Sequence, residues 1–166
     1  WVLRSAIAAA AEWRRDGWRA LRVAVNVSPR QVAAPGFAER LLGLVEAAGL
    51  PPDNIEIELT EHVLQTGEAT IDTLRTLRSH GIGIALDDFG TGYSSLAYLR
   101  RFPFDTLKID RAFVRELLIS RDARSIVHNI LALAKSLRMQ TVAEGVEEPA
   151  QINVLESEGC DLVQVY

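Results

Sequence analysis

The sequence has little of what several classes of protein require. Cys160 is the one cysteine among 166 residues, so no intrachain disulfide can form, as is typical of a reducing compartment. We expect Cys160 to be a small core residue. No apolar run approaches the ~18 residues of a membrane span. Charged residues interrupt the opening segment, so no signal peptide is visible either.

Positive charge and aromatic residues are also scarce. The chain has 18 Lys and Arg against 22 Asp and Glu, which gives a formal net charge of -4. Binding to a nucleic acid polymer depends on Lys and Arg that neutralise phosphates, so no such partner is expected. One small anionic ligand held through a metal ion is still compatible with this charge. Aromatic residues make up 7%, and Trp1, Trp13 and Trp18 are expected to pack the first helix rather than bind a ligand.

The regular feature of the chain is an alternation of short apolar runs with helical segments. The length and the 48% apolar content are sufficient for one globular domain with a core. The predicted strands are 22–27, 55–60, 82–87, 106–110, 141–144 and 162–166, and the predicted helices are 1–19, 37–48, 68–79, 93–101, 112–137 (with a break near 120–122) and 148–158. This alternation predicts an α/β fold with a mainly parallel sheet.

Each predicted strand is apolar until its carboxyl end, where a polar residue follows. These residues are Asn26, Glu58, Asp87 with Asp88, Asp110, Glu144 and Gln164. They are separated by 20 to 34 residues, close to the roughly 30 residues per unit of a (β/α)8 barrel, whose active site lies at the carboxyl ends of the strands. Only six of eight strands are present, so a doubly wound open sheet stays an alternative at this point.

Carboxylates that gather at one edge of a sheet repel one another unless a cation lies between them. Oxygen ligands without Cys or His suit hard ions such as Mg²⁺ or Mn²⁺, and a pair of such ions is a common device for displacement at a phosphodiester. Lys108 lies two residues before Asp110, so both side chains point to the same side of their strand. Lys108 could there orient a water or hold a phosphate oxygen. The other interpretation is a set of structural polar layers, which would require a partner for every buried acid.

The segment after the third predicted strand reads DDFGTGYSS and spans 87–95. Adjacent aspartates point to opposite sides of a regular strand, so the backbone must bend if both bind metal, and the following glycines permit that. The DFG triplet lacks the other kinase motifs. The GTG triplet lacks the third glycine of a dinucleotide fingerprint.

Six segments together resemble the EAL family of cyclic di-GMP phosphodiesterases. They are VNVSPRQ (25–31), IELTE (57–61), DDFGTGYSSL (87–96), LKIDRAFV (107–114), AEGVE (143–147) and GCDLVQ (159–164). They cover nearly the whole chain in the family's order and spacing. The resemblance implies a modified TIM (β/α)8-type barrel. It also implies hydrolysis of cyclic di-GMP to linear pGpG with two Mg²⁺ or Mn²⁺ ions per site.

The resemblance assigns roles to single residues. The implied metal ligands are Asn26, Glu58, Asp87, Asp88 and Asp110, with Asp87 between the two ions and also near the substrate. Asp88 is counted among the catalytic residues as well. Lys108 would contact the catalytic water, and Glu144 would act as general base or organise the metal site.

Two further positions and one loop complete the implied site. Glu61 would anchor the loop after Asp88, and Gln164 would lie near the substrate. The loop 89–95 is implied to couple metal binding to dimerisation, which predicts a homodimer. Linkage to a diguanylate cyclase or a sensor domain is common in the family.

The sequence departs from the family pattern in two places. The acid of the family's E-x-L motif, itself a metal ligand, belongs upstream of the opening helix and is absent, and Val165 replaces a glycine after Gln164. We therefore expect residues 1–166 to be a single, truncated EAL-type domain with about six of eight βα units, weak or inactive in isolation.

Three functional interpretations remain at this stage. The first is a cytoplasmic phosphodiesterase, free or as the cytoplasmic part of a membrane-anchored protein. The second is an inactive cyclic di-GMP receptor, although such relatives typically lose several acidic positions that are kept here. The third is a dimerisation scaffold with relic acids.

Overall fold

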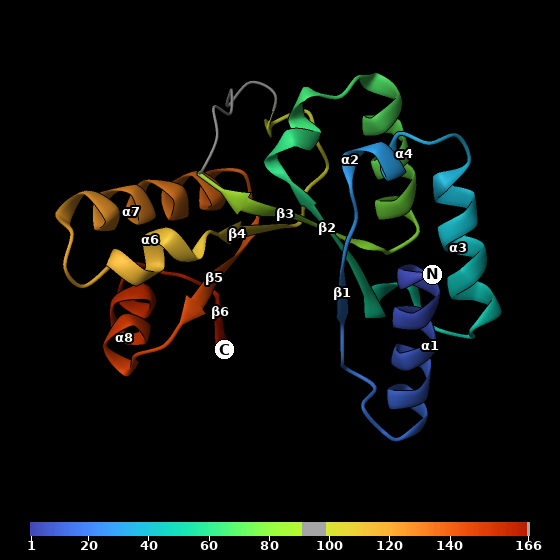
Figure 1. Cartoon of the computed structure of the whole chain (residues 1–166), viewed down its shortest axis with the longest axis horizontal. Helices are drawn as coiled ribbons and strands as arrows, with labels where there is room; N and C mark the ends of the chain where they lie inside the picture. Colours follow the sequence, from blue (N-terminus) through green and yellow to red (C-terminus); the bar gives the residue numbers. More distant parts are fainter. Residues whose placement is uncertain (91–98, 166) are drawn as a thin grey trace. The chain divides into compact units, whose positions relative to one another are not determined.

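The computed structural model describes residues 1–90 and 99–165 as an alternation of helices and strands (Figure 1). The strands are β1 (Val23–Asn26), β2 (Ile55–Thr60), β3 (Gly83–Phe89), β4 (Thr106–Ile109), β5 (Gln140–Val146) and β6 (Leu162–Val165). The α-helices are α1 (Val2–Arg15), α2 (Pro29–Val32), α3 (Phe37–Ala47), α4 (Glu68–Ser79), α6 (Arg111–Glu116), α7 (Arg121–Ser136) and α8 (Pro149–Ser157), with 3-10 turns η1 (Pro52–Asn54) and η2 (Glu61–Gln65). Most of the predicted helix 93–101, and Tyr166, lie outside the described residues.

The strand order decides between the two sheet architectures. The six strands follow the order β1-β2-β3-β4-β5-β6, so each strand neighbours the next one in sequence. Strand β1 runs parallel to β2, and β5 runs parallel to both β4 and β6. A doubly wound sheet reverses its strand order at a switch point, and the observed order has none. The fold is therefore α/β, with the topology of an incomplete TIM-type barrel.

The chain forms two compact units whose boundary falls within β3. The first comprises 1–85 with 101–103, and the second comprises 86–100 with 104–166. Each unit has buried apolar residues that form a core of its own.

The core of the first unit lies between its helices and its strands. Strand β2 is buried along nearly its whole length, as expected for a parallel strand covered on both faces. Ile57, Leu41 and Leu74 are among the fully buried side chains of β2, α3 and α4. Helix α2 begins with a capping box: Ser28 is the N-cap, Pro29 is the first helical residue, and the Ser28 hydroxyl accepts a bond from the Gln31 N–H.

The core of the second unit lies around β4, which is buried over all four of its residues. Leu107, Val127 and Leu155 are fully buried side chains of β4, α7 and α8. The predicted break in the long helical stretch is confirmed, because α6 and α7 are separate helices. Ser120 caps α7 by accepting a hydrogen bond from the Ala123 N–H at 3.2 Å.

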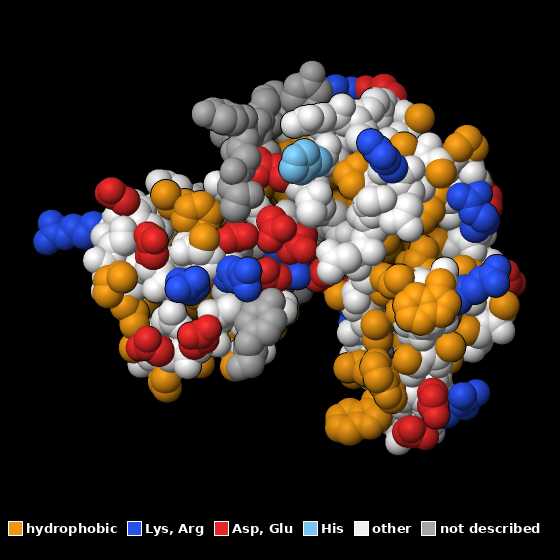
Figure 2. All heavy atoms as spheres, in the orientation of Figure 1, with side chains coloured by type: hydrophobic (Ala, Val, Ile, Leu, Met, Phe, Trp, Pro, Cys, Tyr) orange, Lys and Arg blue, Asp and Glu red, His pale blue; other side chains and the backbone are white. Residues whose placement is uncertain are grey.

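Two expectations about single residues are wrong. Trp1, Trp13 and Trp18 do not pack into a core: they are 94%, 44% and 68% exposed. Helix α1 buries only Ile7 and Ala10, and this narrow apolar face does not cover the three indole rings. Apolar side chains therefore gather at the surface over this helix (Figure 2). Cys160 is only half-buried, because it lies in the turn before β6, where its thiol donates to the Leu162 carbonyl at 3.2 Å. None of the helices in the described part of the chain is long and apolar enough to cross a bilayer.

Candidate metal centre

The two aspartates at the end of β3 adopt different backbone conformations. Asp87 is a regular, buried strand residue, whereas Asp88 has a φ of 54° in the left-handed region, which few residues other than glycine adopt. The Asp88 N–H bonds to Oδ1 of Asp87 at 3.1 Å. The predicted bend is therefore present, and it allows both carboxylates to lie on one side of the strand.

Three carboxylates of the second unit lie close together. One oxygen each of Asp87, Asp88 and Glu144 lie within 4.8 Å of one another. Glu144 comes from β5, and both Asp87 and Glu144 are buried. Negative charges that lie this close together and are shielded from water destabilise the folded protein unless a positive charge lies near them.

Lys108 supplies part of that counter-charge. Its Nζ lies 3.3 Å from Oδ1 of Asp87 and forms an ion pair with Glu144. The side chain of Lys108 is only 6% exposed. The sequence predicted that Lys108 and Asp110 point to the same side of their strand, and the structure places the Lys108 ammonium next to Asp87 and Glu144.

The Asp88 carboxyl lies near the negative charges of Asp87, Asp110 and Glu144. The pKa of this carboxyl is raised from 3.8 to about 6, first by burial and then by the charge of Asp87, a hydrogen bond with Asp110 and the charges of Asp110 and Glu144. The raised pKa shows that the charged form of Asp88 is disfavoured by its surroundings, and a bound cation would favour that form.

Asp110 joins this group from the end of β4. It is the N-cap of α6, and its Oδ1 accepts a bond from the Ala112 N–H at 2.7 Å. Since Asp110 also hydrogen-bonds the Asp88 side chain, the second unit brings together Asp87, Asp88, Lys108, Asp110 and Glu144.

The first unit holds three other predicted residues. Asn26 and Glu58 are register partners on β1 and β2, so their side chains are neighbours at the carboxyl ends of these strands. Glu58 is buried and Asn26 is exposed. Glu61 is buried in the turn directly after β2. That the oxygens of Asn26 and Glu58 share ions with the carboxylates of the second unit stays a prediction.

The remaining predicted features lie at β6 and after β3. Gln164 is half-buried on β6, one residue before Val165, which is 62% exposed and opposite Val146 of β5. Within the described residues, therefore, Val165 is not crowded. Of the predicted loop 89–95, Phe89 is buried and Gly90 has a φ of 100°, and 91–95 lie outside the described residues.

One buried polar side chain next to this group was not predicted. Gln151 on α8 hydrogen-bonds the backbone that follows Glu144 and also reaches α6. The sequence contained a signal for the contact with the Glu148 backbone, because Glu148 and Gln151 have the spacing of a helix capping box. The contact with α6 depends on tertiary packing and has no local signal.

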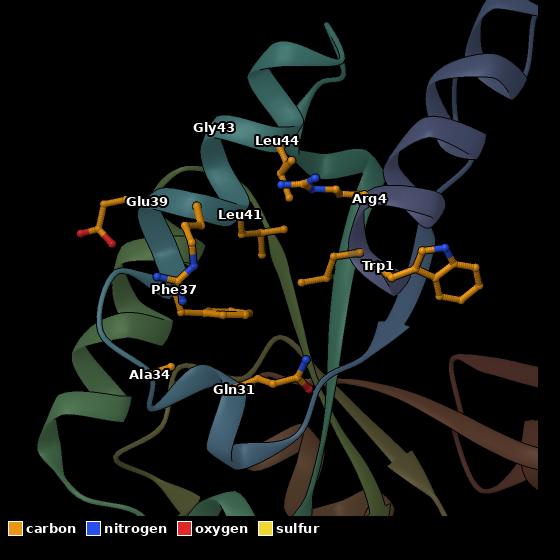
Figure 3. A pocket seen from close by; sticks show the side chains of 11 residues that line it. Trp1, Arg4, Gln31, Ala34, Phe37, Glu39, Leu41, Gly43 and Leu44 are labelled. Carbon is orange, nitrogen blue, oxygen red and sulfur yellow. The ribbon is translucent and has the colours of Figure 1, made fainter.

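The first unit also contains a hollow of about 450 Å³ that none of these residues lines. Side chains of α1, α2 and α3 surround it, including Phe37, Leu41 and Leu44 (Figure 3). Its lining combines apolar side chains with Arg4 and Arg40 and contains none of the carboxylates of the acidic group.

Comparison with known proteins gives one family over nearly the whole chain. The model of the EAL domain family matches residues 1–164. The cyclic di-GMP phosphodiesterase NbdA of Pseudomonas aeruginosa is 41% identical over 167 residues, which cover 100% of this chain and 21% of that protein. The chain spans about a fifth to a quarter of the length of the curated relatives it matches.

Solved structures agree in fold. The complex of the PaMucR phosphodiesterase with cyclic di-GMP superimposes with a TM-score of 0.93 at 39% identity, over 99% of this chain and 67% of that one. The manganese and cyclic di-GMP complex of BlrP1 from Klebsiella pneumoniae gives a TM-score of 0.86 at 34% identity, over 99% of this chain and 42% of that one.

Proposed function

This chain belongs to the EAL domain family, and from that premise we propose that it hydrolyses cyclic di-GMP to linear pGpG with two divalent ions, Mg²⁺ or Mn²⁺. The observation that supports this most strongly is the buried group of Asp87, Asp88 and Glu144 with Lys108 inside it. Among the described residues, this group contains oxygen donors and one ammonium, which fits a hard cation and an anionic substrate.

The proposed ligands of these ions are the polar strand-end residues that the family resemblance implies. Asp87, Asp88 and Asp110 would supply carboxylates, and Asp87 would serve both ions. Asn26 and Glu58 would supply one amide and one carboxylate oxygen. When bound, the ions would polarise the scissile phosphate and lower the pKa of a water between them.

Lys108 and Glu144 carry the proposed chemistry of the attacking water. The Lys108 ammonium donates hydrogen bonds, so it can hold the water oxygen in line with the phosphorus atom. Glu144 accepts the proton that the water loses as its oxygen bonds to phosphorus, or alternatively holds the metal site together. The P–O bond to the ribose oxygen breaks, that oxygen takes up a proton from solvent water, and linear pGpG leaves.

The proposal extends to the surroundings of the site. We place the chain in the cytoplasm with its nucleotide substrate, with residues 1–166 belonging to one EAL-type domain. Glu61 anchors the loop 89–95, Gln164 contacts the substrate, and the loop joins two copies in a homodimer. Linkage to a diguanylate cyclase is supported by MucR of Pseudomonas aeruginosa, a bifunctional cyclase and phosphodiesterase 39% identical to this chain.

The test is hydrolysis of cyclic di-GMP by the full-length protein in the presence of Mn²⁺, with pGpG as the measured product. Glu58→Gln should lower kcat at least 100-fold, since it removes a proposed metal ligand. Glu56→Gln is the matched control: Glu56 is also buried on β2 but pairs with Arg22 at 3.4 Å, so hydrolysis should be retained. Tight binding of cyclic di-GMP without any pGpG would overturn the proposal in favour of a receptor.

A further inference from the structure

The carboxamide of Gln151 is one of the most buried polar groups of the second unit, with 4% of the residue exposed. Its Oε1 accepts hydrogen bonds from the backbone N–H groups of Glu147 at 2.8 Å and Glu148 at 2.9 Å. Its Nε2 donates to the carbonyl of Val114 at 3.0 Å. Both ends of the amide are thus engaged, which fixes its orientation.

Helix capping explains only part of this arrangement. Gln151 is the third residue of α8, and its bond to the N–H of Glu148 is the side-chain half of a capping box. The bond to Val114 has no role in starting α8, because Val114 belongs to α6. A buried amide that reaches out of its own helix ties two separate elements together.

The two segments that Gln151 joins are those that follow two residues of the acidic group. Helix α6 begins directly after Asp110, whose Oδ1 caps it, and Val114 is a fully buried residue of this helix. Glu147 and Glu148 follow the end of β5, only three and four residues after Glu144. A displacement of α6 against the end of β5 would therefore change the separation of the Asp110 and Glu144 carboxylates.

We propose that Gln151 is a positioning residue of the metal site: its carboxamide holds helix α6, and with it the N-cap residue Asp110, in place against the end of β5, which carries Glu144. The inference rests on the proposed function, because it assigns Gln151 to the same site. A carboxamide is suited to this role because it presents a donor to one segment and an acceptor to the other while adding no charge. Residues that orient metal ligands in this way typically change metal affinity by roughly 10–100-fold when replaced.

Two substitutions distinguish the bond from Gln151 to Val114, called here the bridge, from the capping bonds at the start of α8. Gln151→Met keeps the size of the side chain and removes all three hydrogen bonds. Gln151→Glu keeps acceptors for the two N–H groups, as capping boxes commonly do, but places a carboxylate oxygen against the Val114 carbonyl. The added negative charge would by itself strengthen cation binding, so a weaker affinity in Gln151→Glu reports the lost bridge.

The measurement is the Mn²⁺ affinity of the full-length protein by isothermal titration calorimetry, with kcat and KM for cyclic di-GMP as a second readout. Both variants should bind Mn²⁺ roughly 10–100-fold more weakly, and kcat should fall more than KM changes. Thr141→Val is the matched control. It removes the partly buried hydrogen bond from the Thr141 hydroxyl to Asp161 at 2.7 Å, near the start of β5, and should leave Mn²⁺ affinity within about twofold because neither residue belongs to the acidic group.

Each outcome is decisive. If both variants keep the Mn²⁺ affinity of the unmodified protein, or if Gln151→Glu alone restores it, Gln151 is only a helix cap and the inference is overturned. If the unmodified protein binds Mn²⁺ with the predicted sensitivity to Gln151 but produces no pGpG, the proposed hydrolysis fails while the positioning role stands. If the unmodified protein binds no Mn²⁺ at all, both are overturned.

Discussion

Lys108 and Glu144 form an ion pair whose side chains are only 6% and 10% exposed. The pair links neighbouring strands β4 and β5. Taking two charges out of water is costly, and a buried pair often stabilises a protein no more than apolar residues of the same size would. The position of this pair beside Asp87 and Asp88 is better explained by chemistry at the site than by stability.

The first prediction concerns the charge of Lys108. Lys108→Met should lower the free energy of unfolding by about 3–5 kcal/mol in the absence of metal, because buried carboxylates lose their cation. Mn²⁺ should then raise the melting temperature of the variant more than that of the unmodified protein, since the ion replaces the ammonium. Hydrolysis should nevertheless fall by about 100-fold or more. Differential scanning fluorimetry with and without Mn²⁺ measures the stability effects, and assay of pGpG measures the rate.

Lys135→Met is the control for Lys108→Met. Lys135 is exposed on α7 of the same unit, so its replacement should change stability by less than about 0.5 kcal/mol. Equal stabilisation of both variants by Mn²⁺ would contradict the prediction that the ion and the ammonium compete for the same carboxylates.

The second prediction concerns stability and pH. The pKa of Asp88 is about 6 in the folded protein against an ordinary value of 3.8, so the folded state holds this proton more tightly than the unfolded state does. The contribution of Asp88 to stability is therefore largest below pH 3.8 and is lost as the pH rises through about 6. Asp88→Asn, measured by urea unfolding without metal, should be more stable than the unmodified protein above pH 6.

The backbone makes Asp88→Asn a clean substitution. The φ of Asp88 is 54°, and asparagine tolerates this left-handed conformation about as well as aspartate. Asp122→Asn, at an exposed position of α7, controls for the change of net charge. A stability difference between Asp88→Asn and the unmodified protein that is the same at pH 4 and pH 7 would contradict the assigned pKa.

The third prediction concerns metal binding and pH. A carboxylate must lose its proton to bind a metal, so the apparent Mn²⁺ affinity should rise up to about pH 6 and level off above it, following the pKa of Asp88. Calorimetric titrations with Mn²⁺ between pH 5 and pH 8 measure this dependence. An affinity that is constant across this range would show that Asp88 is not a ligand.

The fourth prediction concerns the packing of Gly90, two residues after Asp88. A Cβ at Gly90 would lie 2.9 Å from Cε2 of Phe113 and 3.3 Å from Cδ1 of Ile130, and the φ of Gly90 is +100°. Gly90→Ala should therefore destabilise the protein by about 1–3 kcal/mol through strain and overpacking, as measured by chemical denaturation.

Gly159→Ala separates the two causes. Gly159 also has a positive φ, of +86°, but a Cβ there would meet no atom within 4 Å. Its replacement should cost about 1–2 kcal/mol through backbone strain alone, less than Gly90→Ala. If Gly159→Ala is the more destabilising of the two, the contact of Gly90 with α6 and α7 is not a tight one.

Local patterns predicted most of the elements because their causes are local. Strand β2 and helix α4 have the predicted bounds, since an apolar run and a helical period each end at recognisable caps or turns. Strand β5 was predicted too short: it extends past Glu144 to Val146, through a glycine that breaks the apolar pattern. The exposure of Trp13 and Trp18 was missed because periodicity identifies an apolar face but does not show what covers it.

The sequence by itself determined the α/β class, the polar ends of the strands and the need for a bend between Asp87 and Asp88. These follow from side-chain period and backbone sterics, which act over a few residues. Only the tertiary structure decided that Lys108 pairs with Asp87 and Glu144 and that Gln151 reaches α6. Such contacts depend on strand order and register, which bring together residues more than 20 positions apart and leave no trace in any local pattern.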